Sequence, residues 1–173
     1  MNKEFDINRF ELKNLNNRIL NNFEDDCNFY APRHYILDIY PKGYESKIKR
    51  QMSVDNNISL KDFCICIIAS MNGNINQTYD IVINEKRLSK SELESNYVNY
   101  LRLKENQNFK IIYGDDNTWI FEINVSKVID EYGCPKRLEV ISGEGYGITN
   151  DYNLEITNKF NLEDINAKID FIL

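Results

Sequence analysis

The sequence has few of the residues on which metal sites, disulfides and nucleophilic catalysis depend. Its 173 residues include one histidine and four cysteines. The cysteines are Cys27, Cys64, Cys66 and Cys134, and none of them forms a CxxC pair. Structural zinc sites normally use close pairs of Cys or His ligands, so we predict no metal site. Because His34 has no cysteine or serine near it in any motif, we predict no catalytic residue either.

Long apolar runs are also missing. No stretch of about 18 apolar residues occurs, so we expect no membrane span. The first six residues, MNKEFD, contain no basic segment followed by an apolar one, which excludes a signal peptide of the usual kind. We therefore expect a cytoplasmic protein with reduced cysteines and no cofactor.

The sequence also lacks an excess of positive charge. The formal net charge is −6, which disfavours nucleic-acid binding, since that depends on neutralising phosphates. Lys42, Lys47 and Lys49 form a local basic stretch that could contact phosphates. Lysines of this kind more often protect an edge strand from aggregation, so direct nucleic-acid binding ranks last among our hypotheses.

Helical periodicity appears first near the N-terminus. Residues 5–23 carry apolar side chains at helical spacing, which predicts an amphipathic helix. We assign 1–28 to an N-terminal helical extension and 29–173 to a single α+β domain. The extension could pack on this domain or bind a partner.

The rest of the chain predicts a mostly antiparallel sheet with helices. Alternating apolar residues predict strands at 34–41 and 46–54, joined as a hairpin by a turn that contains Pro41 and Gly43. A helix follows, begun by Ser59 and ended at Asn72 and Gly73. Further elements are predicted by the same patterns: strands at 78–84, 109–113, 119–126 and 137–141, a short helix at 90–95, a Gly-rich loop at 142–147 and a final helix from Asn161. A hairpin followed by a helix and more strands indicates a β-grasp-like α+β fold.

Several segments resemble a known family. The run IKRQMSV at 48–54 resembles the hallmark strand of that family. The segment from SLKDF to MNG at 59–73 resembles the helix that follows this strand, and FKIIYGDD with Trp119 resembles the family's signature. PKR at 135–137 and GEG at 143–145 resemble two later segments. Together they resemble the plasmid pRiA4b open-reading-frame-three-like family, also described as transposon passenger proteins, over about residues 35–150. Phe121 stands where that family commonly has a histidine.

Five residues are the candidate binding residues: Arg50, Asp115, Asp116, Trp119 and Glu144. Arg50 lies on the apolar face of its strand, so it should need a carboxylate partner, either from the 115–116 turn or from Glu122. The two aspartates could orient a ligand beside Trp119, or simply form the turn. The Gly-rich loop could cradle a phosphate but lacks the lysine of a P-loop.

Two functional hypotheses follow. The first is a non-enzymatic binding module that acts through a protein partner and, as the resemblance implies, serves a mobile element or phage. One version is an acidic inhibitor, since residues 138–173 hold seven acidic and two basic side chains. The alternative is a small metal-dependent hydrolase or nucleic-acid enzyme that uses Asp115, Asp116 and Glu144. The oligomeric state is not predicted.

Overall fold

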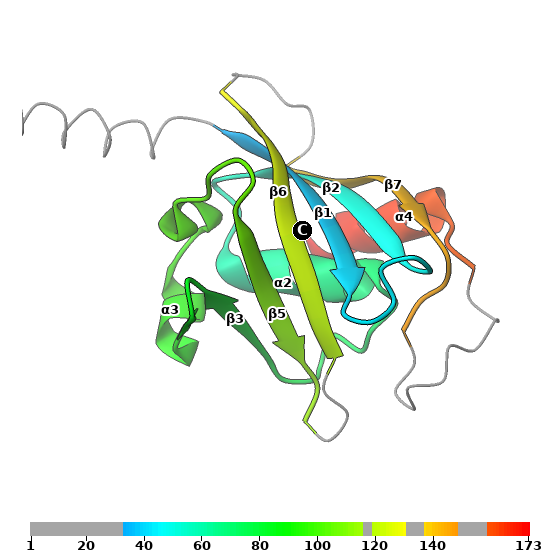
Figure 1. Cartoon of the computed structure of the whole chain (residues 1–173), viewed down its shortest axis with the longest axis horizontal. Helices are drawn as coiled ribbons and strands as arrows, with labels where there is room; N and C mark the ends of the chain where they lie inside the picture. Colours follow the sequence, from blue (N-terminus) through cyan, green and yellow to red (C-terminus); the bar gives the residue numbers. More distant parts are fainter. Residues whose placement is uncertain (1–32, 116–118, 131–136, 149–158) are drawn as a thin grey trace, which may run out of the picture. The chain divides into compact units, whose positions relative to one another are not determined.

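The structure, a computed structural model, describes residues 33–115, 119–130, 137–148 and 159–173. The helix predicted over 5–23 lies outside these residues. Within them the chain is an α+β domain, as predicted, whose helices lie against an antiparallel sheet (Figure 1). No described helix has the length and apolar character required to cross a membrane.

The sheet has seven strands in the order β4-β3-β5-β6-β1-β2-β7, and every neighbouring pair is antiparallel. The strands are β1 (His34–Pro41), β2 (Lys49–Asp55), β3 (Tyr79–Ile83), β4 (Lys86–Arg87), β5 (Asn108–Tyr113), β6 (Trp119–Ile129) and β7 (Leu138–Glu144). The predicted hairpin is β1 with β2, and in it Leu37 opposes Met52 and Ile39 opposes Arg50. The predicted inward face of β2 is confirmed, because Met52 and Arg50 are both buried.

Helix α2 (Leu60–Ser70) covers the inner face of the sheet. The Ser59 side chain accepts a hydrogen bond from the Asp62 amide at 3.0 Å, which is one half of the predicted capping box. The helix ends as predicted, with Gly73 donating its amide to the Ile68 carbonyl at 2.9 Å. Cys66 is buried although it lies off the apolar stripe formed by Leu60, Phe63, Cys64, Ile67 and Ile68, so more of the helix surface is covered than one apolar stripe requires.

Helix α4 (Leu162–Ile172) packs against α2 and β7. Asn161 caps it, and Ile165 and Ile169 are buried. The Asn166 side chain, also on α4, forms two hydrogen bonds of 2.9 Å with Val140 on β7: its Oδ1 accepts from the Val140 amide, and its Nδ2 donates to the Val140 carbonyl. A side chain therefore occupies the place of a neighbouring strand at this edge of the sheet.

Some elements differ from the predicted ones. Strand β4 and the 3₁₀ helix Val98–Leu101 were not predicted, because each is too short to show a period. Strand β7 runs to Glu144 and takes in half of the predicted Gly-rich loop. The short helix predicted at 90–95 is confirmed as α3 (Lys90–Ser95).

The start of α3 supports a prediction on acid stability. The Glu92 carboxylate accepts hydrogen bonds from Lys86 at 2.7 Å, from the Ser89 amide and hydroxyl at 2.8 Å each, and from Tyr100 at 2.9 Å. These bonds, that of Lys86 foremost, lower the pKa of Glu92 from 4.5 to about 2. A lowered pKa stabilises the folded protein above pH 4.5, and this contribution disappears as the pH falls towards 2.

We therefore expect Glu92→Gln to lower the melting temperature at neutral pH and to have progressively less effect as the pH falls from 4.5 towards 2. Glu94→Gln is the matched control, because Glu94 has only a 3.8 Å ion pair with Lys90 on the exposed helix surface. Thermal melts of both variants across this range measure the effect. An equal loss at all pH values would contradict it.

Candidate functional site

Arg50 is the only one of the five predicted site residues with a buried charge among those that the structure describes. The residue is 1% exposed, and its guanidinium is bound by backbone carbonyls. The Nε donates to Ser70 at 2.9 Å, Nη1 donates to Lys49 at 2.8 Å and Glu144 at 2.7 Å, and Nη2 donates to Tyr146 at 3.0 Å. The predicted pairing with Asp115 or Glu122 is wrong, because within the described residues no acidic side chain forms an ion pair with Arg50.

The Gly-rich segment and Phe160 complete this enclosure of Arg50. The Phe160 ring lies 4.5 Å from the guanidinium carbon. A Cβ at Gly143 would come within 2.7 Å of Phe160 and 2.9 Å of the Arg50 side chain. At Gly145, with φ +81°, a Cβ would be 1.8 Å from the Lys47 carbonyl oxygen. The glycines are thus accounted for by close packing, without a phosphate.

Burial has a cost for this cation. It lowers the pKa of Arg50 from 12.5 to about 10, because the folded protein removes water that stabilises the charge. The four carbonyls and the aromatic ring offset that cost. With its donors directed at the backbone and almost no exposed surface, Arg50 holds β2, β7, the end of α2 and the segment at 160 together.

Asp115 and Trp119 have contacts of their own. Asp115 accepts a hydrogen bond from the Thr78 hydroxyl, and Trp119 is 3% exposed, with its ring centroid 5.5 Å from that of Tyr44. Asp116 lies outside the described residues. Glu144 contributes its backbone carbonyl to Arg50, and its side chain is exposed. The structure therefore joins Glu144 to Arg50 through the backbone only.

The described residues also bring no set of reactive groups together. Cys64 and Cys66 are buried, and burial raises the pKa of both thiols, that of Cys66 to about 12. The His34 Nε2 is 4.0 Å from an Asp55 oxygen. In the same part of the chain no three His, Cys, Asp or Glu side chains are placed to hold a metal ion.

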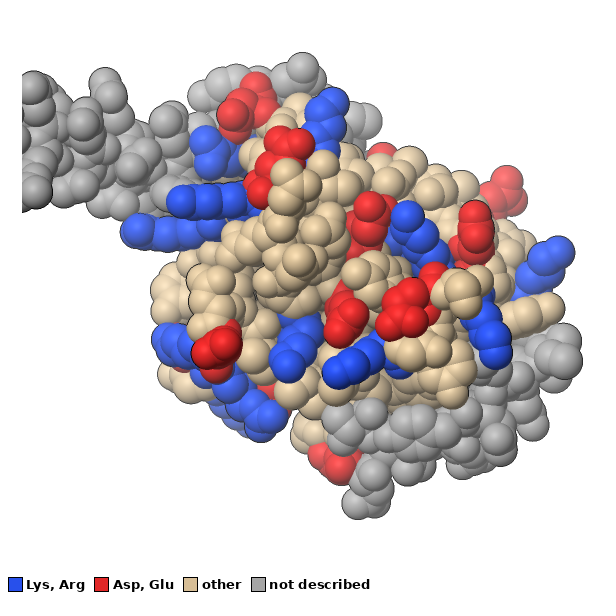
Figure 2. All heavy atoms as spheres, viewed as in Figure 1, with Lys and Arg blue, Asp and Glu red and all other residues tan. Residues whose placement is uncertain are grey.

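The described helices leave the outer face of the sheet open. In Figure 1 helices α2 and α4 lie behind the sheet, and no described helix crosses the front of β1, β5 or β6. Figure 2 shows that basic and acidic side chains alternate with uncharged ones over this face. Two opposite-charge pairs belong to it, Lys49 with Asp38 at 3.4 Å and Arg87 with Asp80 at 3.4 Å.

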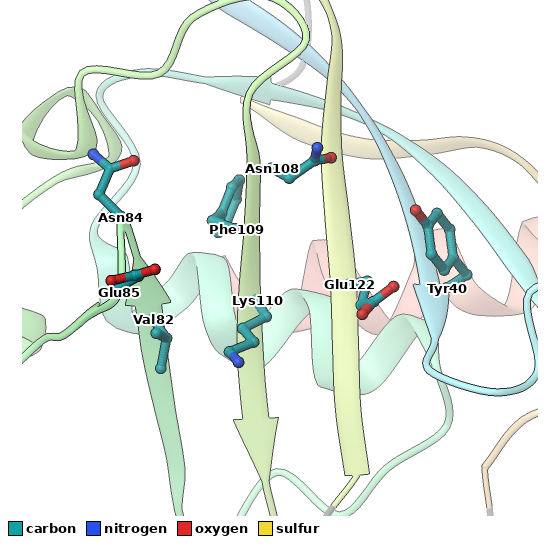
Figure 3. Close-up of a pocket in the computed structure, with 8 residues that line it drawn as sticks. All are labelled: Tyr40, Val82, Asn84, Glu85, Asn108, Phe109, Lys110 and Glu122. Carbon is teal, nitrogen blue, oxygen red and sulfur yellow. The ribbon is translucent and has the colours of Figure 1, made fainter.

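A hollow of about 500 Å³ opens on this face across β3, β5, β6 and β1 (Figure 3). Its lining residues are Tyr40, Val82, Asn84, Glu85, Asn108, Phe109, Lys110 and Glu122. It offers an ammonium, two carboxylates, a phenol and two amides beside apolar surface, so it can bind a polar partner through charge and hydrogen bonding.

Sequence reasoning did not find the hollow. It named Glu122 only as a possible partner for Arg50, but the two side chains point to opposite faces of the sheet: Arg50 is buried with the inner face, whereas Glu122 lies on the outer one. Strand alternation does place Lys110 and Glu122 on one face. What brings them together is the pairing of β5 with β6, and the hollow also depends on β3 and β1.

Comparisons with known proteins bear on the fold alone. No family model and no curated protein matches the chain. A solved structure that is similar is the crystal structure of a protein of unknown function from Methanosarcina mazei Go1, with a TM-score of 0.57 and 12% identity. The likeness covers 66% of this chain and 71% of that one. It shows that this arrangement of strands and helices occurs in another protein.

Proposed function

We propose that this protein is a non-enzymatic binding module that acts through a protein partner, which it contacts with the outer face of its sheet. The observation that carries the proposal is the open sheet face with its hollow. An uncovered sheet face can serve as a platform, because the ladder of hydrogen bonds fixes the backbone and hence the direction in which each side chain leaves it. Charged, amide and aromatic groups on such a platform suit a polar interface.

The biological setting is part of the same proposal. The resemblance to the plasmid pRiA4b family implies an accessory role in a mobile element or phage. An acidic inhibitor is one form of that role, in which the negative charge of this protein attracts a groove on the partner. Such an interaction would weaken strongly at about 1 M salt, where charges are screened within about 3 Å.

Site-specific cross-linking tests the proposal. The photo-reactive residue p-benzoylphenylalanine would replace Tyr40 on the outer face or, as the control, Phe171 on α4. Phe171 is 92% exposed whereas Tyr40 is half-buried, so the control is an aromatic position that is more accessible, on the helix behind the sheet. Each protein would be irradiated in a lysate of cells that carry the gene.

We expect one discrete covalent adduct from the Tyr40 position and none from the Phe171 position. The adduct should also be lost when Lys110→Glu is added, because that change reverses a charge in the hollow. Adducts from Phe171 alone, or from neither position, would show that the outer face does not bind the partner. Turnover of a substrate by the purified protein would overturn the non-enzymatic part.

A further inference from the structure

Three charged side chains line the hollow, Glu85, Lys110 and Glu122, and the last two have opposite charges that do not neutralise each other. Lys110 on β5 and Glu122 on β6 are direct cross-strand neighbours, a position in which opposite charges usually pair. Among the described residues, however, neither side chain forms an ion pair or a hydrogen bond. The other close pairs on this face, such as Lys49 with Asp38, do meet.

The two side chains point apart. Figure 3 shows the Lys110 ammonium directed towards β3 and the Glu122 carboxylate directed towards Tyr40. Tyr40 is the cross-strand neighbour of Glu122 on β1, so a carboxylate and an aromatic ring lie side by side. That combination binds a guanidinium or an ammonium, through a charge-assisted hydrogen bond and a cation–π contact.

At the other end of the hollow the Lys110 ammonium is available to an anion. Asn108 on β5 and Asn84 and Glu85 on the turn after β3 also line the hollow. Neighbouring strands are about 4.8 Å apart. The cation and anion positions are therefore separated by roughly one to two strand spacings, about 5–10 Å.

We infer that the hollow binds a paired basic and acidic side chain from the protein partner: an arginine or lysine against Glu122 and Tyr40, and a carboxylate against Lys110. The inference rests on the proposed function, since the ligand is a segment of protein. Residues two apart on an extended segment are about 7 Å apart, which matches the separation in the hollow. A segment with the sequence basic–any–acidic therefore fits without strain.

Capped tripeptides are the probe. The peptide acetyl-Arg-Ala-Glu-amide carries both charges, and acetyl-Arg-Ala-Gln-amide and acetyl-Gln-Ala-Glu-amide carry one each. Each would be titrated into the ¹⁵N-labelled full chain at low salt, with amide chemical shifts as the readout. We expect saturable shifts at Tyr40, Lys110 and Glu122, with the doubly charged peptide binding at least about fivefold more tightly than either control.

Three variants assign the contacts. Glu122→Gln should abolish the advantage of arginine over glutamine in the peptide, and Lys110→Gln should abolish that of glutamate. Glu139→Gln on β7, a residue that does not line the hollow, should change neither. Equal affinity for the three peptides, shifts centred outside the hollow, or an equal effect of Glu139→Gln would overturn the inference.

The two experiments distinguish failure of the charge-pair inference from failure of the proposed function. If cross-linking at Tyr40 captures a partner but the peptides do not differ, the outer face is the interface and the charge-pair inference is wrong. If the peptides differ as expected but no adduct forms at Tyr40, the hollow has the inferred chemistry and the proposed use of the whole face is wrong.

Discussion

Replacement of Arg50 by alanine should lower the free energy of unfolding by about 4 kcal/mol or more. The change removes the donor to four carbonyls, those of Lys49, Ser70, Glu144 and Tyr146. The bond to Ser70 is buried and the other three are partly buried; a buried acceptor left without a partner costs about 1–3 kcal/mol, and a cavity adds to the loss. Urea denaturation of the two proteins measures the difference.

Lys49→Ala is the matched control, since Lys49 precedes Arg50 on the same strand and faces the opposite way. Its side chain is 48% exposed and has a 3.4 Å ion pair with Asp38, so we expect a loss below about 1 kcal/mol. The loss caused by Arg50→Ala should be similar at about pH 5 and about pH 8, because carbonyls do not titrate. A loss that becomes smaller in mild acid would point to a carboxylate partner after all.

Gly145→Ala should destabilise the protein by at least about 3 kcal/mol more than Gly43→Ala. Both glycines have a positive φ, +81° and +84°, so both variants incur the cost of about 1–2 kcal/mol for a left-handed backbone. The two positions differ in the room for an added Cβ atom. No atom lies within 4 Å of a Cβ at Gly43, whereas a Cβ at Gly145 would be 1.8 Å from the Lys47 carbonyl oxygen.

The clash has a further effect, because Gly145 lies between two residues whose carbonyls bind Arg50. Relief of the overlap must move the segment away from Lys47, and that movement weakens the enclosure of the guanidinium. Chemical denaturation of the two variants under one set of conditions compares them directly. Equal losses would mean that the loop can move aside freely, and would contradict the close packing described for this segment.

The fold could be predicted to a large extent from local pattern. Alternation predicted β1 and β2 and their inward residues, and helical spacing with a cap predicted α2 and α4. Elements of two to four residues, such as β4, could not be found this way. The register shift between Gln51 and Met52 opposite β7 also has no local signal, because it depends on a strand about 90 residues further along the chain.

The environment of Arg50 shows why the candidate site was harder to predict than the fold. The alternation of side chains along β2 correctly placed Arg50 on the inner face, and a buried charge does need a partner. The partner nevertheless came from backbone carbonyls, and every residue type has one. No sequence pattern marks which carbonyls will converge, although the glycines at 143 and 145 indicate that some backbone must approach closely.

The amide of Asn166 has a consequence for how copies of this protein behave at high concentration. An unpaired strand edge is a template on which another chain can add a strand, and successive additions lead to fibres. At one edge of this sheet Asn166 already occupies the backbone of Val140, and at the other β4 has only two residues, Lys86 and Arg87, both charged. Growth by strand addition is therefore hindered at both edges of the sheet.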